Sequence, residues 1–428
     1  MMVSQTARRV GANLRARILA LAALTVTSLV VARTAGAAGV GDLTLLRVLP
    51  WLTGLALSSG VYAAAPYFLS GPDRFESRFR TTIPTMALAA GAAGGALWAL
   101  ASPVFARDIF SDVPPVLVAA AGISVLTQLV ESTAKACSQG YGDWGGSNRV
   151  IVLEELLFLP WYGLLLATGV GKYAAIVFAL PLGDVSTSLL AWTRLARRGY
   201  FDGAGRPSLA LARRVSGYGL RAEAGSLMQT LNARLDFAIV AALLGPRSVG
   251  VYAIASRYAE LLRLPSLALN YVLLHGYARD GEGVAADGAR RSLARLWWTP
   301  LAAAVPMALL APVVLPLAYG SDFRGSAAPA VVLLAGLTGC VVNGIVSAYL
   351  AGVGRPGLNS AAIGAGLLVT VLLDVLLIPR WHVMGAAAAS SFTYLTTTAV
   401  LVVLFRRTYR RASAAAVPVS PRVLEVTP

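Results

Sequence analysis

Residues 30–41 read VVARTAGAAGVG and residues 239–250 read IVAALLGPRSVG. In both segments the pattern Gly-x-x-x-Val-Gly follows an apolar run. A second matched pair, GYGDWG (140–145) and GVGRPG (352–357), has a similar offset, and an apolar run follows each copy. The two pairs indicate that a unit of the chain is duplicated. An even number of membrane spans per unit would give both copies the same orientation, with their symmetry axis along the membrane normal.

The composition predicts a membrane protein. The chain has 428 residues, of which 57% are hydrophobic and 13% are charged. Soluble proteins carry about 25% charged residues, so the apolar side chains here are expected to face a lipid bilayer. Apolar runs separated by polar or Gly/Pro-rich segments predict twelve spans, near residues 16–37, 43–69, 82–102, 114–137, 150–169, 172–193, 215–244, 249–277, 293–318, 327–351, 358–378 and 384–405.

The basic residues predict the orientation of these spans. A net charge of +16 would indicate nucleic-acid binding only if the charge were clustered on a folded soluble surface. Here the basic residues separate apolar runs instead, so no nucleic-acid partner is expected. With twelve spans, most of the 36 Lys and Arg residues lie on the side that holds both termini. The positive-inside rule therefore predicts that both termini are cytoplasmic.

One long polar connection divides the chain almost in half. It is rich in Arg and Gly and predicts a cytoplasmic linker. The predicted fold is an all-α integral membrane protein with about twelve transmembrane helices in two pseudo-symmetric six-helix bundles around a central cavity. The predicted parts are an N-terminal bundle (1–193), the basic linker (194–214), a C-terminal bundle (215–405) and a disordered cytoplasmic tail (406–428).

Charged residues inside the spans are the main candidates for function. The seventh, eighth and eleventh spans hold Arg221, Glu223, Arg234, Asp236, Arg257, Glu260, Arg263 and Asp374. A charge in the bilayer costs about 3 kcal/mol on insertion, so these residues are expected to face a polar interior or a partner. Two interpretations remain open. The charges either form ion pairs that hold helices together, or line a cationic cavity that takes an anionic substrate.

The short turn at 245–248 makes the seventh and eighth spans antiparallel neighbours. Asp236 and Arg257 lie at equal distances from this turn, and opposite charges at one depth should pair. The sequence therefore predicts an Asp236–Arg257 salt bridge, with Glu260 as the competing partner of Arg257. The alternative is that each side chain faces the cavity separately.

Other motifs do not indicate a catalytic, cofactor or metal site. The Gly-x-Gly-x-x-Gly patterns at 140–145 and 352–357 join apolar spans, so loops are favoured over a dinucleotide site. His275 and His382 have no metal-ligand neighbour at a useful spacing. The sequence therefore predicts that the protein is not an enzyme and binds no cofactor or metal.

Several stretches resemble the polysaccharide-exporter branch of the multidrug/oligosaccharidyl-lipid/polysaccharide (MOP) superfamily, the Wzx-type flippases. They are residues 30–50, 231–265, 317–336 and 351–391. The resemblance implies two bundles that open alternately to each side of a bacterial plasma membrane. It implies a polyprenyl diphosphate oligosaccharide as the cargo, with the bilayer and glycan-assembly proteins as further partners.

A cationic cavity would suit the diphosphate of such a cargo. The predicted substrate-binding residues are Arg221, Arg234, Arg257 and Arg263, and the predicted ion-pair or coupling residues are Glu223, Asp236, Glu260 and Asp374. A membrane-bound polysaccharide polymerase or ligase is one alternative, but it needs a large external loop and the predicted external loops are short. A small-molecule exporter of the same superfamily is another.

Overall fold

The computed structural model of the protein describes residues 2–278 and 282–415, and every regular element in these residues is a helix. The elements are α1 (Met2–Leu57), α2 (Val61–Ser70), η1 (Pro72–Phe75), α3 (Phe79–Asp108), α4 (Pro115–Ala120), α5 (Ile123–Gly140), α6 (Trp144–Leu156), α7 (Phe158–Ala167), α8 (Lys172–Arg197), α9 (Leu209–Leu244), α10 (Pro246–Glu260), η2 (Leu261–Arg263), α11 (Leu264–Tyr277), α12 (Glu282–Leu296), α13 (Thr299–Tyr319), η3 (Ser321–Ser326), α14 (Ala327–Leu337), α15 (Cys340–Gly352) and α16 (Pro356–Ala415). The predicted all-α class is confirmed.

Helix α1 consists of two antiparallel segments. Gly36 has non-helical backbone angles (φ 71°, ψ −166°), which glycine adopts without a steric penalty because it has no Cβ atom. Ser28 and Thr44, on opposite sides of Gly36 in the sequence, both accept hydrogen bonds from the guanidinium of Arg257. The chain therefore reverses direction at Gly36 and crosses the protein twice within α1.

Helix α16 has the same construction. His382 has a non-helical backbone (φ 52°), and the hydroxyl oxygens of Thr370 and Thr393, from opposite sides of it, are 2.7 Å apart. Eight helical stretches, α1 and α16 among them, are long and apolar enough to cross a membrane. When the two halves of α1 and α16 are counted separately, these stretches give ten segments. The predicted seventh and eighth spans coincide with α9 and α10–α11, which are helical but are not among the eight stretches.

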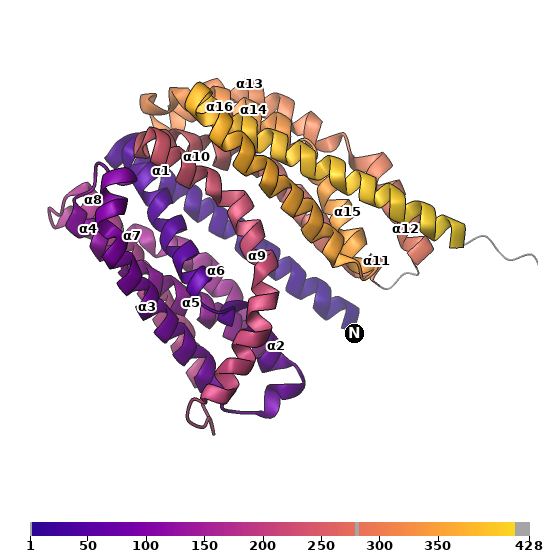
Figure 1. Cartoon of the computed structure of the whole chain (residues 1–428), viewed down its shortest axis with the longest axis horizontal. Coiled ribbons are helices and arrows are strands. Elements are labelled where there is room, and N and C mark those ends of the chain that lie inside the picture. The colour runs from indigo at the N-terminus through magenta and orange to yellow at the C-terminus, as the bar shows by residue number, and fades with distance from the viewer. Residues whose placement is uncertain (1, 279–281, 416–428) are drawn as a thin grey trace, which may run out of the picture.

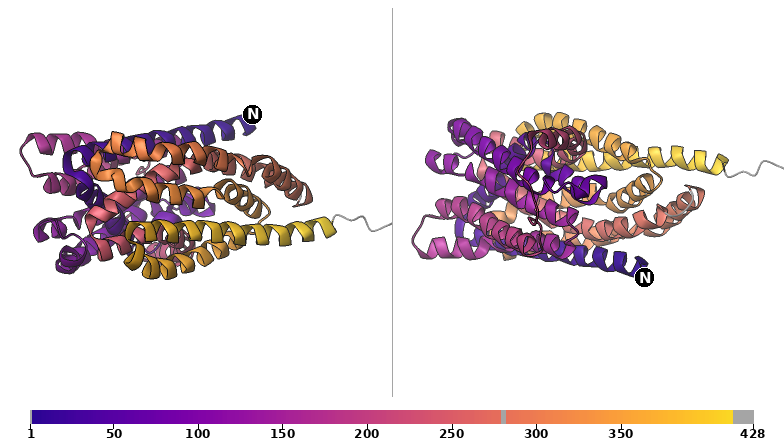
Figure 2. Two further views of the ribbon diagram at one scale, coloured as in Figure 1. Left: turned by 90° about the horizontal axis from the view of Figure 1, so that it is seen from above. Right: turned by 90° about the horizontal axis from the view of Figure 1, so that it is seen from below.

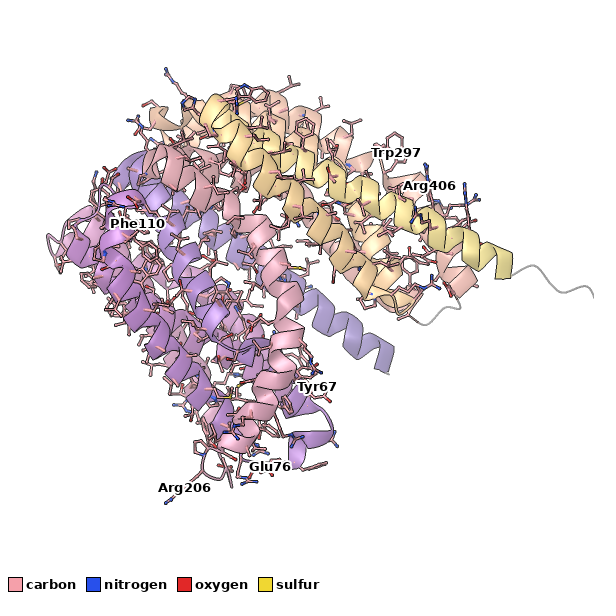
Figure 3. All side chains as sticks on the ribbon, viewed as in Figure 1. Tyr67, Glu76, Phe110, Arg206, Trp297 and Arg406 are labelled. Atoms are coloured by element: carbon pink, nitrogen blue, oxygen red, sulfur yellow. The ribbon has the colours of Figure 1, made fainter. Side chains whose placement is uncertain are left out.

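The helices form two groups that meet at one end and diverge toward the other (Figure 1). We call α1–α8 the N-lobe and α10–α16 the C-lobe. Helix α9 runs between them and packs on α2 and α3 of the N-lobe and on α10 and α16 of the C-lobe. The start of α1 and the end of α16 both lie toward the diverging end, here called the open end (Figure 2). In the N-lobe, Phe110 lies at the junction end, and Glu76 and Arg206 lie at the open end (Figure 3).

The lobes meet where the two Gly-x-x-x-Val-Gly segments touch. A Cβ atom on Gly41 would lie 1.9 Å from the carbonyl oxygen of Pro246, and one on Gly250 would lie 1.9 Å from the carbonyl oxygen of Ala37. Only glycine allows two helices to approach this closely, since the backbones themselves are in contact. The duplicated motifs therefore form the contact between α1 and α10 that joins the lobes.

Backbone angles support the internal duplication. Gly36 and Gly245 begin the two copies of the first motif and have φ values of 71° and 80°. Gly142 and Gly354 occupy matching positions in the second motif and have φ values of 83° and 75°. Each pair takes up the same positive-φ conformation at the same point of its repeat, as two pseudo-symmetric bundles require.

The motif at 140–145 forms a turn between α5 and α6, as predicted, and Asp143 holds it in shape. The Asp143 carboxylate accepts hydrogen bonds from the backbone N–H of Gly146 (3.0 Å) and from Nε of Arg194 (2.6 Å). Burial raises the pKa of Asp143, but the hydrogen bonds from Arg194 and Gly146 outweigh burial and keep this pKa below its usual value. The turn is thus tied to the end of α8.

The predicted domain boundaries stay predictions. Helix α8 ends at Arg197 and α9 begins at Leu209, so part of the 194–214 linker is helical. Helix α16 continues to Ala415, and residues 416–428 of the predicted tail lie outside the described residues.

We expect Gly41→Ala and Gly250→Ala to push α1 and α10 apart, because the added methyl group has no space. Overpacking of this kind costs about 1–3 kcal/mol, which would increase opening at the junction end by about fivefold to a hundredfold. The measurement is the rate at which a membrane-impermeant thiol reagent modifies a Ser248→Cys reporter beside the contact. Gly163→Ala is the control, since a Cβ atom there meets nothing within 4 Å. Unchanged rates in both test variants would contradict the proposed junction.

Candidate functional site

A cavity of about 370 Å³ lies between the lobes. Helices α1, α5, α6 and α8 supply its N-lobe wall, and α9 and α10 supply the opposite wall. Its charged lining residues come from both walls and are Arg47, Glu131, Lys135, Glu154, Glu155, Asp184, Arg234, Arg257 and Glu260.

Two basic residues of the N-lobe wall are neutralised by glutamates. Arg47 of α1 forms a salt bridge with Glu155 of α6, and Lys135 Nζ lies 2.5 Å from Glu154 Oε2. The four side chains are only 15% to 26% exposed. Pairing allows these charges to remain within the membrane region, where single charges would be costly.

The same wall carries two further carboxylates. Asp184 of α8 accepts a hydrogen bond from the hydroxyl of Thr127 (2.7 Å), and Glu131 of α5 lies within electrostatic reach of Asp184. Both residues are buried. Neither forms a salt bridge with another residue in the described part of the chain. The N-lobe wall therefore has an acidic section next to its paired charges.

The opposite wall carries two arginines with a different environment. Arg257 of α10 reaches across to the N-lobe, where it donates hydrogen bonds to the hydroxyls of Ser28 and Thr44 (3.0 Å for Thr44). Arg234 of α9 lies over the ring of Phe237, with 5.6 Å between its Cζ and the ring centroid. Among residues 2–278 and 282–415, neither arginine forms a salt bridge. Both remain available to an anion in the cavity.

The predicted Asp236–Arg257 salt bridge is wrong. The Asp236 carboxylate accepts hydrogen bonds from the hydroxyls of Tyr252 (2.6 Å) and Ser390 (3.3 Å), whereas Arg257 faces α1. Tyr252 and Arg257 are five residues apart on α10, so their side chains project about 140° apart around the helix axis. Glu260, the predicted competitor, forms no salt bridge with Arg257 in the described residues either. Equal depth in the membrane is therefore not enough for pairing when the side chains point in different directions around the helix.

Comparison with known families identifies the chain. The sequence model of the family described as "Polysaccharide biosynthesis protein" matches residues 73–328. The chain belongs to this family. A search of curated proteins found no match.

Several solved structures share the fold of this chain. An inward-facing multidrug resistance MATE family transporter of the MOP superfamily matches with a TM-score of 0.74 and 17% identity, over 94% of this chain and 95% of that chain. The lipid II flippase MurJ, in an inward closed conformation, matches with a TM-score of 0.73 and 12% identity, over 94% and 90%. A MOP superfamily transporter from Pyrococcus furiosus matches with a TM-score of 0.66 and 15% identity, over 96% of each chain. At these identities the matches show a shared fold, and the predicted fold of two pseudo-symmetric bundles is confirmed.

The structure distributes the four predicted substrate-binding arginines over three environments. Arg234 and Arg257 line the central cavity, and Arg263 lines a second cavity inside the C-lobe. Arg221 is exposed on α9. The substrate-binding roles of all four residues stay predictions.

The four predicted coupling residues are also separated. Glu260 lines the central cavity, and Glu223 is buried against the N-lobe, where it accepts a hydrogen bond from the hydroxyl of Ser58 (3.0 Å). Asp236 and Asp374 are buried in the C-lobe. Neither carboxylate oxygen of Asp374 has a hydrogen-bond partner among the described residues.

The charged residues of the N-lobe wall were not among the predicted site residues. Arg47, Lys135 and Asp184 lie within predicted spans of the first half, whereas every site residue predicted from the sequence lies in the second half. The sequence does contain a pattern that could have predicted them: several spans of the first half each hold an acidic or basic residue. Such residues are rare in lipid-facing positions and indicate a polar interior.

This wall adds acidic residues to the cationic cavity that the sequence predicts. The lining includes five acidic residues beside its four basic ones. The basic residues without carboxylate partners are concentrated on the wall formed by α9 and α10, and the acidic section lies opposite. The cavity is therefore polarised across its width: the α9–α10 wall carries Arg234 and Arg257 beside one carboxylate, Glu260, and it faces the acidic section.

We expect Arg47→Met to destabilise the protein, because Glu155 would become a buried charge without its partner. Loss of one partner from a buried pair typically costs about 3–5 kcal/mol, whereas replacement of both by apolar residues is often nearly neutral. The double variant Arg47→Met/Glu155→Leu should therefore recover most of the thermal stability measured in detergent.

The exposed Arg107–Asp108 pair provides the control, as its side chains are 78% and 45% exposed. Asp108→Asn should leave the thermal stability close to that of the wild type, because water screens exposed ion pairs. If Arg47→Met were as stable as this control, the N-lobe pair would not have the structural role assigned to it.

Proposed function

We propose that the protein moves a polyprenyl diphosphate-linked oligosaccharide from the cytoplasmic to the outer leaflet of a bacterial plasma membrane. The observation that carries the proposal is the pair Arg234 and Arg257 on one wall of the inter-lobe cavity, without salt-bridge partners in the described residues. Guanidinium groups bind phosphate oxygens through paired hydrogen bonds, which suits a diphosphate headgroup. Membership of the polysaccharide biosynthesis family supports a glycan as the rest of the cargo.

Arg257 also connects substrate binding to the movement of the lobes. Its hydrogen bonds to Ser28 and Thr44 join α10 to α1 across the cavity. A bound diphosphate competes for the same guanidinium donors, because charge-assisted hydrogen bonds to phosphate are stronger than those to a hydroxyl. Loading of the substrate would therefore weaken an inter-lobe contact and favour separation of the lobes at the junction end. This is alternating access driven by differential affinity for two states.

In this proposal the open end faces the cytoplasm, as the distribution of basic residues predicts, and both termini lie there. Asp236, Asp374, Glu223 and Glu260 are proposed as structural or coupling residues. Glycan-assembly proteins would supply the cargo at the cytoplasmic face and receive it outside.

A small-molecule exporter is the second candidate, and the acidic section of the N-lobe wall favours it. Glu131 and Asp184 would attract an organic cation rather than a diphosphate. A membrane polymerase or ligase has less support. The connections at the junction end, such as 109–114 and 168–171, are too short to hold both a glycan donor and an acceptor.

Reconstitution in proteoliposomes tests the proposal. With a fluorescent polyprenyl diphosphate trisaccharide, Arg234→Gln and Arg257→Gln should each slow translocation by at least about tenfold, since a hydrogen bond to a charged group contributes about 1.5–3 kcal/mol. The measurement is the fraction of labelled lipid that becomes accessible to an impermeant quencher. Arg107→Gln, which removes an exposed arginine outside the cavity, should translocate at the wild-type rate.

The same vesicles separate the two candidates. Wild-type translocation of the lipid-linked trisaccharide, lost in both cavity variants, supports the flippase. Export of ethidium that is lost in Glu131→Gln and Asp184→Asn, without translocation of the lipid, would replace the flippase with a cation exporter.

A further inference from the structure

A second cavity, of about 340 Å³, lies between α9 and the C-lobe helices α11, α14, α15 and α16, and we call it the C-lobe cavity. Four asparagines line it, and Arg263 is the one charged residue among its described lining residues. The asparagines come from four different elements and are Asn232, Asn270, Asn343 and Asn359. Such a concentration of carboxamides is unusual within an apolar helical bundle, where polar side chains need partners.

Backbone contacts fix two of the carboxamides. Asn270 donates from Nδ2 to the carbonyl oxygen of Gly344 (2.9 Å), and Asn359 donates from Nδ2 to that of Ser347 (3.1 Å). These hydrogen bonds hold the amide groups in defined orientations without using their Oδ1 atoms. The site is therefore organised before any ligand binds.

Several polar atoms at the cavity remain unused. Oδ1 of Asn343, Oδ1 of Asn359 and Oγ1 of Thr397 are buried and have no hydrogen-bond partner among the described residues. Buried acceptors without partners are rare in folded proteins, because each loses its hydrogen bonds to water. Three of them at one cavity indicate a ligand that presents hydrogen-bond donors.

The chemistry of the wall selects the class of ligand. An organic cation would find no carboxylate among the described lining residues, and an apolar chain would leave the buried acceptors unpaired. A neutral molecule rich in hydroxyl groups satisfies the acceptors, and Tyr394 adds an aromatic ring to the wall. The cavity volume lies within the range of small-molecule sites, which is about 300–1,000 Å³.

We propose that this C-lobe cavity binds an uncharged sugar ring of the transported glycan, while the arginines of the central cavity hold the diphosphate. The inference rests on the proposed function, which it extends by giving the glycan its own site. Residues one helical turn apart line the two cavities: Glu260 lines the central one and Arg263 lines the other. Tyr394 lies within electrostatic reach of both these residues.

A thiol-protection experiment on the full chain in detergent tests the sugar site. Ser347 lines the cavity and is half-buried, so a Ser347→Cys reporter can be modified by a small methanethiosulfonate reagent. Saturating maltotriose or triacetylchitotriose, both uncharged and free of lipid and phosphate, should slow this modification. Inorganic pyrophosphate should not. If neither trisaccharide slows the modification, or if pyrophosphate alone does, the sugar site is wrong.

Substitutions of the cavity asparagines test where the trisaccharide binds. Asn343→Leu and Asn359→Leu should each raise the trisaccharide concentration needed for half-protection by about fivefold, the value of one net hydrogen bond. Asn148→Leu is the matched control, since Asn148 accepts a hydrogen bond from Asn13 and lies outside both cavities. Equal protection in all three variants would overturn the assignment of these asparagines. If an asparagine variant fails to fold, protection of the Ser347→Cys reporter without further substitutions still decides whether the cavity binds a sugar.

Failure of the sugar site and failure of the proposed function give different results. Arg234→Gln and Arg257→Gln should lose lipid translocation but keep sugar protection, since neither residue lines the C-lobe cavity. Protection without any wild-type translocation would overturn the flippase and leave a sugar site. Translocation without protection would overturn the sugar site and leave the flippase.

Discussion

The contact between α1 and α10 determines the arrangement of the whole molecule. Within lipid, helices gain little from burying apolar side chains, so close packing of backbones has to hold them together. Gly41 and Gly250 allow this packing because their missing Cβ atoms leave room for the carbonyl oxygens of Pro246 and Ala37. The two lobes are fixed to each other at this one end, and the cavity between them follows from their divergence.

The charged residues of the cavity are balanced in two different ways. The N-lobe balances most of its cavity charges internally, through Arg47–Glu155 and Lys135–Glu154. Arg257 instead takes its hydrogen-bond partners from the other lobe. A charge balanced within one lobe moves with it as a rigid unit, whereas a charge shared across the cavity has to exchange partners when the lobes separate. A charge that is shared across the cavity, such as that of Arg257, can therefore respond to an anion.

The fold could be predicted from the sequence to a large extent. The length of the apolar runs predicted the number of spans, and the two glycine motifs indicated the duplication that backbone angles at Gly36 and Gly245 support. The contacts of individual charges could not be predicted in the same way. Asp236 and Arg257 share a depth but face different helices, because the direction of a side chain around its helix depends on how the bundle packs. For the same reason Arg234 and Arg263 line different cavities, although each lies within a predicted apolar span.

The divergence of the lobes gives the protein unequal cross-sections at its two ends (Figure 1). In a bilayer, the leaflet at the open end must make room for a wider body than the leaflet at the junction end. In the proposed alternating-access mechanism, a change from one opening to the other would transfer that area between the leaflets and do work against lateral pressure. The proposed conformational equilibrium would then be coupled to the packing of the surrounding lipids, so that a difference in tension between the leaflets would favour one orientation of the cavity even without a ligand.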